Sequence, residues 1–364
     1  MEKPTVSTLF AGCGGDTLGF VNAGFELVYA NDNNPDACDT LRRNYEIIKI
    51  KKEAKEIHKE HVQKINEFKS SNVITGGFPC QGFSLAGPRQ VEDKRNILYQ
   101  DLKRAINTVK PEFFVAENVK GFVTIGETTS AKFFHNGKII KLGIVASAII
   151  EEFKKMGDNG YDVSYELHNV KDFGLPQDRE RIIIVGVRND LDFKFKFPKP
   201  THGDGLLPHV SMEKYGIRDI NFTKKDIFME KKGARKDYFS SRYMSRNRIR
   251  KWSETSFTIP AEASQIPASP DCTTMWNIDV TGKNRPKDTE WAEFRKNHDK
   301  DIAKDLIRLS WKQCAAIQGF PSDYEFSGNI KSIYKQIGNA VPPPLMQKIA
   351  DHIMPYFKGK KSSY

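Results

Sequence analysis

The sequence has few cysteines and no long apolar run. Its 364 residues include five cysteines, an odd number with no Cys-x-x-Cys pair, which argues against a disulfide scaffold and against a structural zinc site. A reducing cytosol fits this usage. The longest near-continuous apolar stretch, residues 142–150, is far shorter than the ~20 residues that a membrane helix needs. The first ten residues lack the hydrophobic region of an export signal, so we expect no export.

Acidic residues are also in deficit. The chain carries 57 Lys or Arg against 46 Asp or Glu, a formal net charge of +11. Residues 224–251 alone hold eleven basic and three acidic side chains, with Tyr238, Phe239, Tyr243 and Trp252 interleaved or adjacent. Such a mixture suits contacts with the phosphates and bases of a nucleic acid. A solvated lysine-rich face explains the charge equally well.

Short apolar runs alternate with helical patterns over the first half of the chain. The predicted strands are Val6–Ala11, Glu26–Ala30, Val73–Gly76, Phe113–Glu117, Val163–His168 and Ile182–Val187. This alternation predicts an α/β fold with a doubly wound, mostly parallel sheet. Residues 192–222 then lose any sustained period and gain Phe, Pro, His and Gly, so we place a domain boundary near residue 190.

A glycine-rich turn follows the first predicted strand. Residues Phe10–Gly15 read FAGCGG and lead toward a helix near Asp16, where glycines let a ligand approach the backbone at a helix N-terminus. The second strand ends at Asn31-Asp32, and a carboxylate there can accept hydrogen bonds from a ribose diol. The two features indicate an adenosine-containing cofactor. A turn of this kind also serves nicotinamide enzymes.

Two chemically active side chains follow the next strands. Cys80 lies in the Gly-rich loop of residues 76–84, and Glu117 ends the following strand, so adjacent parallel strands would bring both to one rim of the sheet. Cys80 is a candidate nucleophile and Glu117 a candidate acid. An isolated cysteine is more often a small core residue, and a lone glutamate a surface group. Arg179 and Arg181, at strand spacing, are expected to share a face and bind a carboxylate, carbonyl or phosphate.

Taken together, these motifs resemble those of the DNA (cytosine-5)-methyltransferase family. The likeness covers nearly the whole chain in the family's order, at Phe10–Gly15, Pro79–Ser84, Glu117–Val119, Gln177–Arg181, Arg308–Pro321 and Gly338–Pro342. Six motifs in order are far more specific than one. The resemblance implies a Rossmann-like methyltransferase sheet in residues 1–190, a smaller inserted target-recognition domain in 191–329, and a segment, 330–364, that returns to the catalytic domain.

By this resemblance the cofactor is S-adenosyl-L-methionine, and no metal is required. Phe10 would pack on its adenine, Asp32 would hold its ribose, and Gly12, Gly14 and Gly15 would admit its amino-acid end. The other positions expected to line the cofactor are Asn33, Pro79, Leu98, Asn339 and Ala340. Asn33 stands where the family commonly has a tryptophan stacked on the adenine.

The resemblance also implies a reaction and a substrate. Cys80 would add to C6 of a cytosine, Glu117 would bond N3 and the exocyclic amine, and Arg181 would hold O2. Arg179 would orient the acid. Because a base inside a duplex cannot be reached, the cytosine must be flipped out. The residues expected to contact double-stranded DNA are Gln81, Ser84, Arg242, Arg246, Arg248 and Arg250.

The expected setting is a bacterial or archaeal cytoplasm, with a cognate restriction endonuclease encoded nearby. Residues 243–259 are similar to domains that recognise GGCC-like sites, but the likeness fades after Pro260, so no site is assigned. One alternative is a transfer RNA cytosine-5 methyltransferase, whose Cys-Phe-Thr triplet this sequence lacks. The others are an inert DNA-binding regulator on the same fold, against which Cys80, Glu117 and Arg181 argue, and a nicotinamide oxidoreductase, which leaves the Cys80 and Glu117 motifs unexplained.

Overall fold

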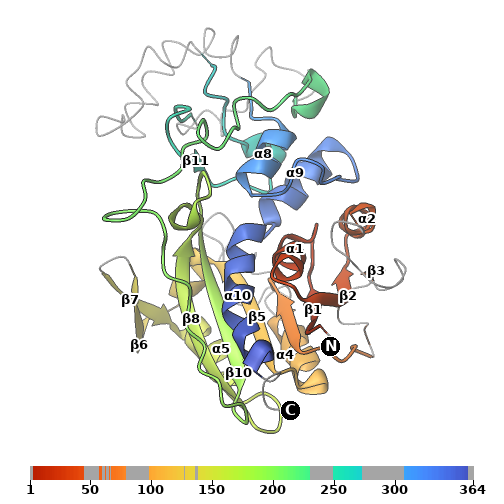
Figure 1. The fold of residues 1–364 in the computed structure, drawn as a ribbon, viewed down its shortest axis with the longest axis vertical. Helices are drawn as coiled ribbons and strands as arrows, with labels where there is room; N and C mark the ends of the chain where they lie inside the picture. Colours follow the sequence, from red (N-terminus) through yellow and green to blue (C-terminus); the bar gives the residue numbers. More distant parts are fainter. Residues whose placement is uncertain are drawn as a thin grey trace. The chain divides into compact units, whose positions relative to one another are not determined.

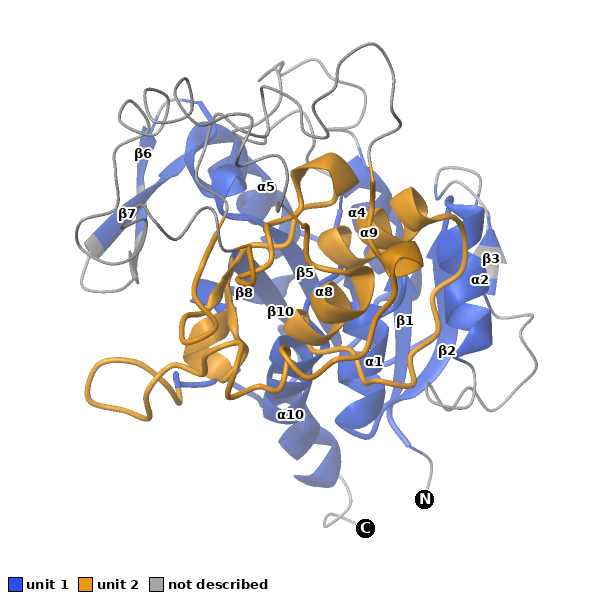
Figure 2. Ribbon diagram, turned by 90° about the horizontal axis from the view of Figure 1, so that it is seen from above, with its two compact units in different colours: residues 1–169, 180–200, 340–364 blue, residues 170–179, 201–339 orange. Residues whose placement is uncertain are grey.

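The computed structural model divides the chain into two compact units. It describes residues 3–44, 57–59, 62, 65, 67–78, 98–126, 128–135, 138–229, 249–272 and 307–359. Unit 1 comprises residues 1–169, 180–200 and 340–364, and unit 2 comprises residues 170–179 and 201–339 (Figure 2). Three segments thus differ from the division that the sequence suggested. Residues 191–200 remain in unit 1. Residues 170–179 belong to unit 2, and so do residues 330–339, because helix α9 (Ile330–Asn339) packs with α8 (Trp311–Ile317).

Unit 1 is built on a seven-stranded sheet in the order β3-β2-β1-β4-β5-β10-β8 (Figure 1). The strands are β1 (Thr5–Leu9), β2 (Glu26–Asp32), β3 (Ile57–Lys59), β4 (Val73–Gly76), β5 (Phe113–Val119), β8 (Tyr161–Asn169) and β10 (Glu180–Arg188). Strand β10 is antiparallel to both of its neighbours, and the other pairs are parallel. The predicted doubly wound, mostly parallel sheet is confirmed, and all six predicted strands are present.

Helices cover both faces of this sheet. Helices α1 (Gly15–Asn22) and α10 (Pro343–Gly359) lie on one face, and α4 (Leu98–Val109) and α5 (Ile144–Lys154) lie on the other (Figure 1). The alternation of β5 shows the reason: the Phe113 ring meets Phe357 of α10, whereas Phe114 meets Phe153 of α5. Helix α2 (Pro35–Arg43) follows β2, and the Asn34 side chain caps it by accepting from the Asp36 N–H.

The C-terminal helix packs closely on the first helix. A Cβ added at Gly19 of α1 would lie 2.7 Å from Cβ of Met346 on α10, and one added at Gly15 would lie 2.1 Å from the Val341 carbonyl oxygen. These glycines therefore allow a backbone approach that any side chain would block. This contact brings the segment after Ala340 to the glycine-rich turn.

Four further strands, β6, β7, β9 and β11, were not predicted from the periodicity of the sequence. Strands β6 (Thr128–His135) and β7 (Lys138–Gly143) form an antiparallel ribbon after the 3-10 helix η4 (Lys120–Thr124), and β9 (Gln177–Asp178) pairs with β11 (Ser256–Phe257). Each strand of the ribbon has two apolar residues in succession, Phe133-Phe134 in β6 and Ile139-Ile140 in β7. It therefore lacks the alternation of apolar and polar residues that marks a half-buried strand.

Unit 2 contains little regular structure in its described part. Three 3-10 helices, η5 (Val170–Phe173), η6 (Lys224–Asp226) and η7 (Ala263–Gln265), accompany helices α8 and α9. Ser310 and Gln313 form a capping box that starts α8, and buried Tyr334 of α9 donates to the Leu309 carbonyl. Within the described ranges, no helix has the length and apolar character needed to cross a membrane.

Candidate active site

The glycine-rich turn between β1 and α1 has a left-handed backbone. Phe10, Gly12 and Gly14 have φ angles of 53°, 53° and 88°, a region that costs a phenylalanine conformational energy and costs glycine little. The Gly14 N–H donates to the Ala11 carbonyl at 2.8 Å and closes the turn. A Cβ built on Gly12 meets no atom within 4 Å, so open space faces this residue. The turn can therefore admit a ligand close to the N-terminus of α1.

Asp32 ties the end of β2 to this turn. Its Oδ2 accepts from the Gly12 N–H and its Oδ1 from the Asn34 N–H, both at 2.8 Å. Each carboxylate oxygen has a second lone pair, so Asp32 can still accept from ribose hydroxyl groups. Asn33, the next residue, is exposed. The turn, the partly buried Phe10 ring and Asp32 thus fit an adenosine-containing cofactor.

Glu117 and Arg181 form an ion pair at the carboxyl end of β5. Arg181 Nε lies 2.8 Å from Glu117 Oε1, and both side chains are 12% exposed. Antiparallel register places Arg181 beside Val119, two residues beyond Glu117, so both side chains emerge on one face of the sheet. The partly exposed pair presents a hydrogen-bonding carboxyl group beside a guanidinium. That combination can bind the amide-like edge of a pyrimidine base.

The segment that leads to Cys80 is fastened beside this pair. The Asn118 side-chain amide donates to the Phe78 carbonyl at 3.3 Å, and a Cβ on Gly77 would lie 3.0 Å from Glu117 Oε2. The chain therefore reaches Glu117 two residues before Pro79-Cys80. Four predicted site residues of this loop, Pro79, Cys80, Gln81 and Ser84, lie outside the described residues.

Asp16 is a buried acid that the sequence reasoning did not select. It is 4% exposed, at the second position of α1, and its Oδ1 accepts from the Thr17 N–H at 2.8 Å. Burial, and to a smaller extent the charge of Glu117, raises its pKa to about 7. The sequence offered one sign of it, since Asp16 is the one charged residue in a helix of mostly apolar and small residues. Recognising it required knowing that Glu117 lies nearby.

Arg179 lies in unit 2, whereas Arg181 lies in unit 1. Arg179 is 1% exposed and donates to the carbonyls of Ile259 at 3.1 Å and Gly338 at 2.9 Å. Arg179 lies between β9 and β10, outside both strands. The prediction that Arg179 and Arg181 share one face of a strand is therefore wrong. These bonds give Arg179 a structural role within unit 2.

Gln177 continues the same buried network. Its side chain accepts from the Ile259 N–H at 2.9 Å and donates to Gln318 Oε1 at 2.8 Å. Gln318 in turn donates to the Ile337 carbonyl at 2.6 Å. Hydrogen bonds within unit 2 therefore connect residues from three of the sequence motifs, Gln177–Arg181, Arg308–Pro321 and Gly338–Pro342.

The remaining predicted residues are placed as follows. Leu98 begins α4 and packs partly buried against the core. Asn339 ends α9 and is exposed, and Ala340, the next residue, is buried in unit 1. The Arg250 guanidinium stacks on Phe257 with its carbon 4.2 Å from the ring centroid. Arg242, Arg246 and Arg248, with most of the basic segment, lie outside the described residues.

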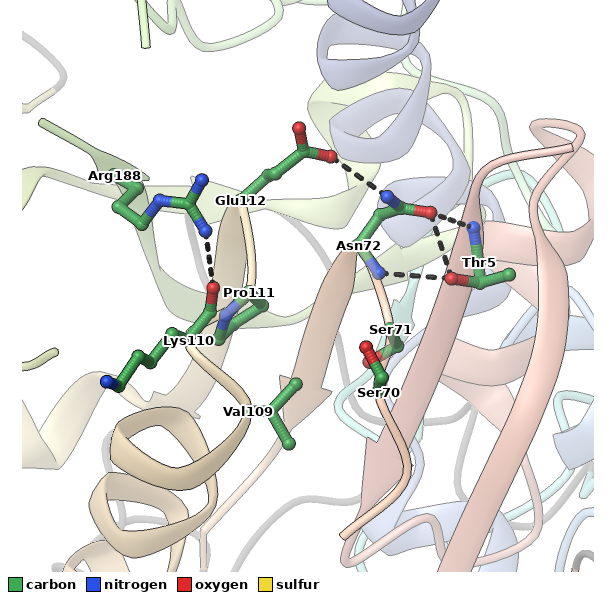
Figure 3. A pocket seen from close by; sticks show the side chains of 9 residues that line it. All are labelled: Thr5, Ser70, Ser71, Asn72, Val109, Lys110, Pro111, Glu112 and Arg188. Carbon is green, nitrogen blue, oxygen red and sulfur yellow. Dashed lines mark hydrogen bonds between the residues drawn. The ribbon is translucent and has the colours of Figure 1, made fainter. Parts of the chain in front are cut away.

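A polar cavity of about 330 Å³ lies in unit 1, away from this site (Figure 3). It borders the amino ends of β1 and β4, where Asn72 accepts from the Thr5 N–H and donates to Glu112. Arg188 donates to the Lys110 carbonyl and to Asp190, whose pKa it lowers. Several of the lining residues therefore bond to one another and stabilise the amino ends of β1 and β4. No cluster of three metal-ligating side chains occurs among the described residues.

Comparison with known proteins gives matches over nearly the whole chain. The profile of the C-5 cytosine-specific DNA methylase family matches residues 5–355. The type II methyltransferase M.BspRI of Lysinibacillus sphaericus is 39% identical, covering 97% of this chain and 82% of its own. M.BsuRI of Bacillus subtilis is 36% identical over 97% of this chain and 79% of its own.

Solved structures resemble the fold at lower identity. The Entamoeba histolytica methyltransferase EhMeth superposes with a TM-score of 0.63 at 15% identity, covering 99% of each chain. The S. pombe Dnmt2 methyltransferase gives a TM-score of 0.61 at 14% identity and covers both chains fully, 100% of each. Such likeness supports the α/β architecture.

Proposed function

The chain belongs to the C-5 cytosine-specific DNA methylase family and is a DNA (cytosine-5) methyltransferase, and from this premise we propose its chemistry. The enzyme transfers a methyl group from S-adenosyl-L-methionine to C5 of a cytosine flipped out of a short double-stranded DNA sequence. Cys80 adds covalently to C6 during the reaction. The relatives' names, all type II methyltransferases, support a role as the modification enzyme of a restriction-modification system.

One observation carries this proposal: the Glu117–Arg181 pair at the carboxyl end of β5, with the chain before Cys80 fastened next to it. Cytosine presents N3 and its exocyclic amine beside O2. Glu117 can bond the first two groups and Arg181 can donate to O2, so the pair matches that edge. A Cβ at Gly77 would lie 3.0 Å from Glu117 Oε2, and Cys80 follows Gly77 by three residues, which supports the assignment of Cys80 as the nucleophile.

The side chains have distinct chemical tasks. C5 of cytosine is a weak nucleophile, and the Cys80 thiolate activates it by adding to C6. Glu117 and Arg181 stabilise the charge that then develops on N3 and O2. After methylation, loss of the C5 proton and elimination of Cys80 restore the aromatic ring. Arg179 acts indirectly, by holding the segment that leads into β10.

The residues of unit 1 fit the methyl donor. The open space at Gly12, the left-handed Phe10 and the acceptor oxygens of Asp32 would hold its adenosine and amino-acid parts, together with Pro79, Leu98 and Ala340. When bound, this group supplies an electrophilic methyl attached to a sulfonium. Gly14 and Gly15 would admit its amino-acid end, and the lack of a side chain at Gly15 also lets the Val341 carbonyl approach the turn. Asn33 offers no aromatic surface, so Phe10 carries the stacking.

The DNA substrate would be held by the basic side chains of residues 224–251 and by the loop that follows Cys80. Gln81 and Ser84 are assigned to the DNA around the flipped base, and Arg242, Arg246, Arg248 and Arg250 to phosphates or guanine edges. We place the protein in a bacterial or archaeal cytoplasm, where its substrate lies. A cognate endonuclease encoded nearby completes the proposed setting.

Sequencing can test this function directly. The gene is expressed in a bacterial host that lacks cytosine methylation, and the host DNA is sequenced after chemical conversion of unmethylated cytosines. We expect protected cytosines at one position of one short motif. The Glu117→Gln variant serves as the inactive control. Protection of host transfer RNA with unprotected DNA would instead identify the RNA methyltransferase, and no protection in either would favour the inert regulator.

A further inference from the structure

Asp16 is unusual because it is a buried carboxyl group, only 4% exposed, at the start of α1. Its Oδ1 accepts from the Thr17 N–H at 2.8 Å, and its Oδ2 lies 3.5 Å from the Thr75 hydroxyl. Across the residues that the structure places, no Lys, Arg or His forms an ion pair with it. Burying a carboxyl group in this way penalises its charged form, so such residues are rare unless they have a function.

The neighbouring strands place this acid next to Glu117. Thr75 of β4 and Gly77 are two residues apart, so their Cβ positions share one face of the sheet. The Thr75 hydroxyl approaches Asp16, and a Cβ on Gly77 would lie 3.0 Å from Glu117 Oε2. In the register of β4 with β5, Thr75 pairs with Val115, two residues before Glu117. The two carboxyl groups therefore occupy successive positions over one face.

The charges of this cluster do not balance when both acids are ionised. Arg181 supplies one positive charge at 2.8 Å from Glu117 Oε1, whereas Asp16 and Glu117 together supply two negative charges. The cluster becomes neutral when the two acids retain one proton. Their interaction is mutual, since burial and the charge of Glu117 both raise the pKa of Asp16 to about 7.

The other groups that the structure describes on the elements packed against the cluster do not add a positive charge to Asp16. From the turn before α1, Cys13 is buried and its pKa is raised, so it stays a neutral thiol. From β8, His168 lies opposite Arg181 in register, and its Nδ1 is 3.9 Å from Glu166. From α10, the residues that meet α1 at Gly19 are Pro343, Met346 and Gln347, which carry no charge.

We propose that Asp16 and Glu117 hold one proton between them and that Asp16 is the positioning residue that makes Glu117 available as an acid at neutral pH. The inference rests on the proposed function and deepens it. As the Cys80 Sγ–C6 bond forms, the C5=C6 electron pair moves into the C4–C5 bond. The C4=N3 pair then moves onto N3, which takes the proton from the Glu117 carboxyl. Without Asp16, the Glu117–Arg181 pair is already neutral and retains no proton.

The pH dependence of the Asp16→Asn variant tests this role. The variant keeps the acceptor for the Thr17 N–H but removes the charge. Between pH 6 and pH 8, its kcat should fall about tenfold more than that of the wild type. The protonated fraction of an acid that titrates near pH 7 falls about tenfold over this interval, whereas that of an acid that titrates well below pH 6 falls about a hundredfold. Asp36→Asn is the matched control, since Asp36 occupies the same second position in α2. It should keep the wild-type profile.

A profile of Asp16→Asn that matches the wild type would overturn the proposal. Carboxyl ¹³C NMR provides a second measurement that requires neither activity nor the Asp16 variant. We expect an aspartate resonance of the wild type that titrates near pH 7 to titrate at lower pH in Glu117→Gln. An unchanged midpoint would also overturn the coupling. If the wild type methylates no DNA, the proposed function fails, while the NMR titration still decides the coupling.

Discussion

At the scale of single residues, Cys80 and Asp16 differ in how far sequence alone identifies them. Cys80 and Glu117 stand in motifs whose order along the chain is itself specific, so the roles proposed for them come from the sequence without coordinates. Asp16 has no motif, and its significance comes from Thr75 and Glu117, which lie 59 and 101 positions further along the chain. Strand spacing also predicted that Arg179 and Arg181 share a face, because spacing alone does not reveal the break between β9 and β10.

Replacing Cys80 by serine should abolish methyl transfer and leave cofactor binding nearly unchanged. A serine hydroxyl at neutral pH is a far weaker nucleophile than a thiolate, whereas the assigned cofactor contacts are made mainly by other residues. Methyl incorporation into DNA and calorimetric titration with the cofactor measure the two effects. Cys272→Ser is the control, since its Sγ donates to a backbone carbonyl that serine can also reach. Wild-type turnover in Cys80→Ser would reject the covalent mechanism.

Asp16 should also make the folded state less stable as the pH rises. Its pKa is about 7 in the folded protein, against 3.8 for a solvated aspartate, so the folded state binds the proton more tightly. Stability is therefore lost between about pH 4 and pH 7, and the total loss is at most about 4 kcal/mol. Asp16→Asn should be more stable than the wild type at pH 8, and the difference should shrink toward pH 5. Urea unfolding at both pH values measures this, and a pH-independent difference would contradict it.

At the scale of elements, the regular strands were predictable and the irregular ones were not. Strands β1, β4 and β5 are short apolar runs bounded by polar or glycine residues, a pattern that sequence reading recognises. Residues 170–179 carry no composition signal, because their place in unit 2 depends on Gln177 and Arg179 bonding to residues some 80 to 160 positions away. Long-range hydrogen bonds of this kind leave no local pattern.

The β5–β10 pair contains a position that tests the packing of the sheet. A Cβ on Gly186 would lie 1.9 Å from Cε1 of Phe114, its cross-strand partner, so the aromatic ring occupies the space that a side chain would need. Gly186→Ala should lower the free energy of unfolding by about 1–3 kcal/mol or more, as overpacking does. Gly359→Ala is the control, since nothing lies within 4 Å of its Cβ position. Equal denaturation midpoints would show that Phe114 moves freely.

At the scale of the whole molecule, charge is concentrated in residues 224–251, which hold +8 of the +11 net charge. Reversing Lys231, Lys232 and Arg235 to glutamate should weaken DNA binding and flatten its salt dependence. Each lost phosphate contact reduces the slope of log K against log salt by about 0.9. Reversal of Lys3, Lys154 and Lys155, exposed lysines of unit 1, is the control. Fluorescence anisotropy at several salt concentrations gives both slopes, and an unchanged slope would identify the segment as a solvated face.

The division of the chain into units has a consequence for protein engineering. The backbone crosses between the units four times, at 169/170, 179/180, 200/201 and 339/340. A chimera that exchanged only residues 201–339 with a relative would carry away Ile259, Gln318 and Gly338 while leaving Gln177 and Arg179 behind. A chimera that keeps the buried hydrogen bonds of the Gln177 amide and the Arg179 guanidinium must therefore also exchange the ten-residue segment 170–179. Unit 2 consists of two separated pieces of chain, so a library of chimeras should exchange both pieces together.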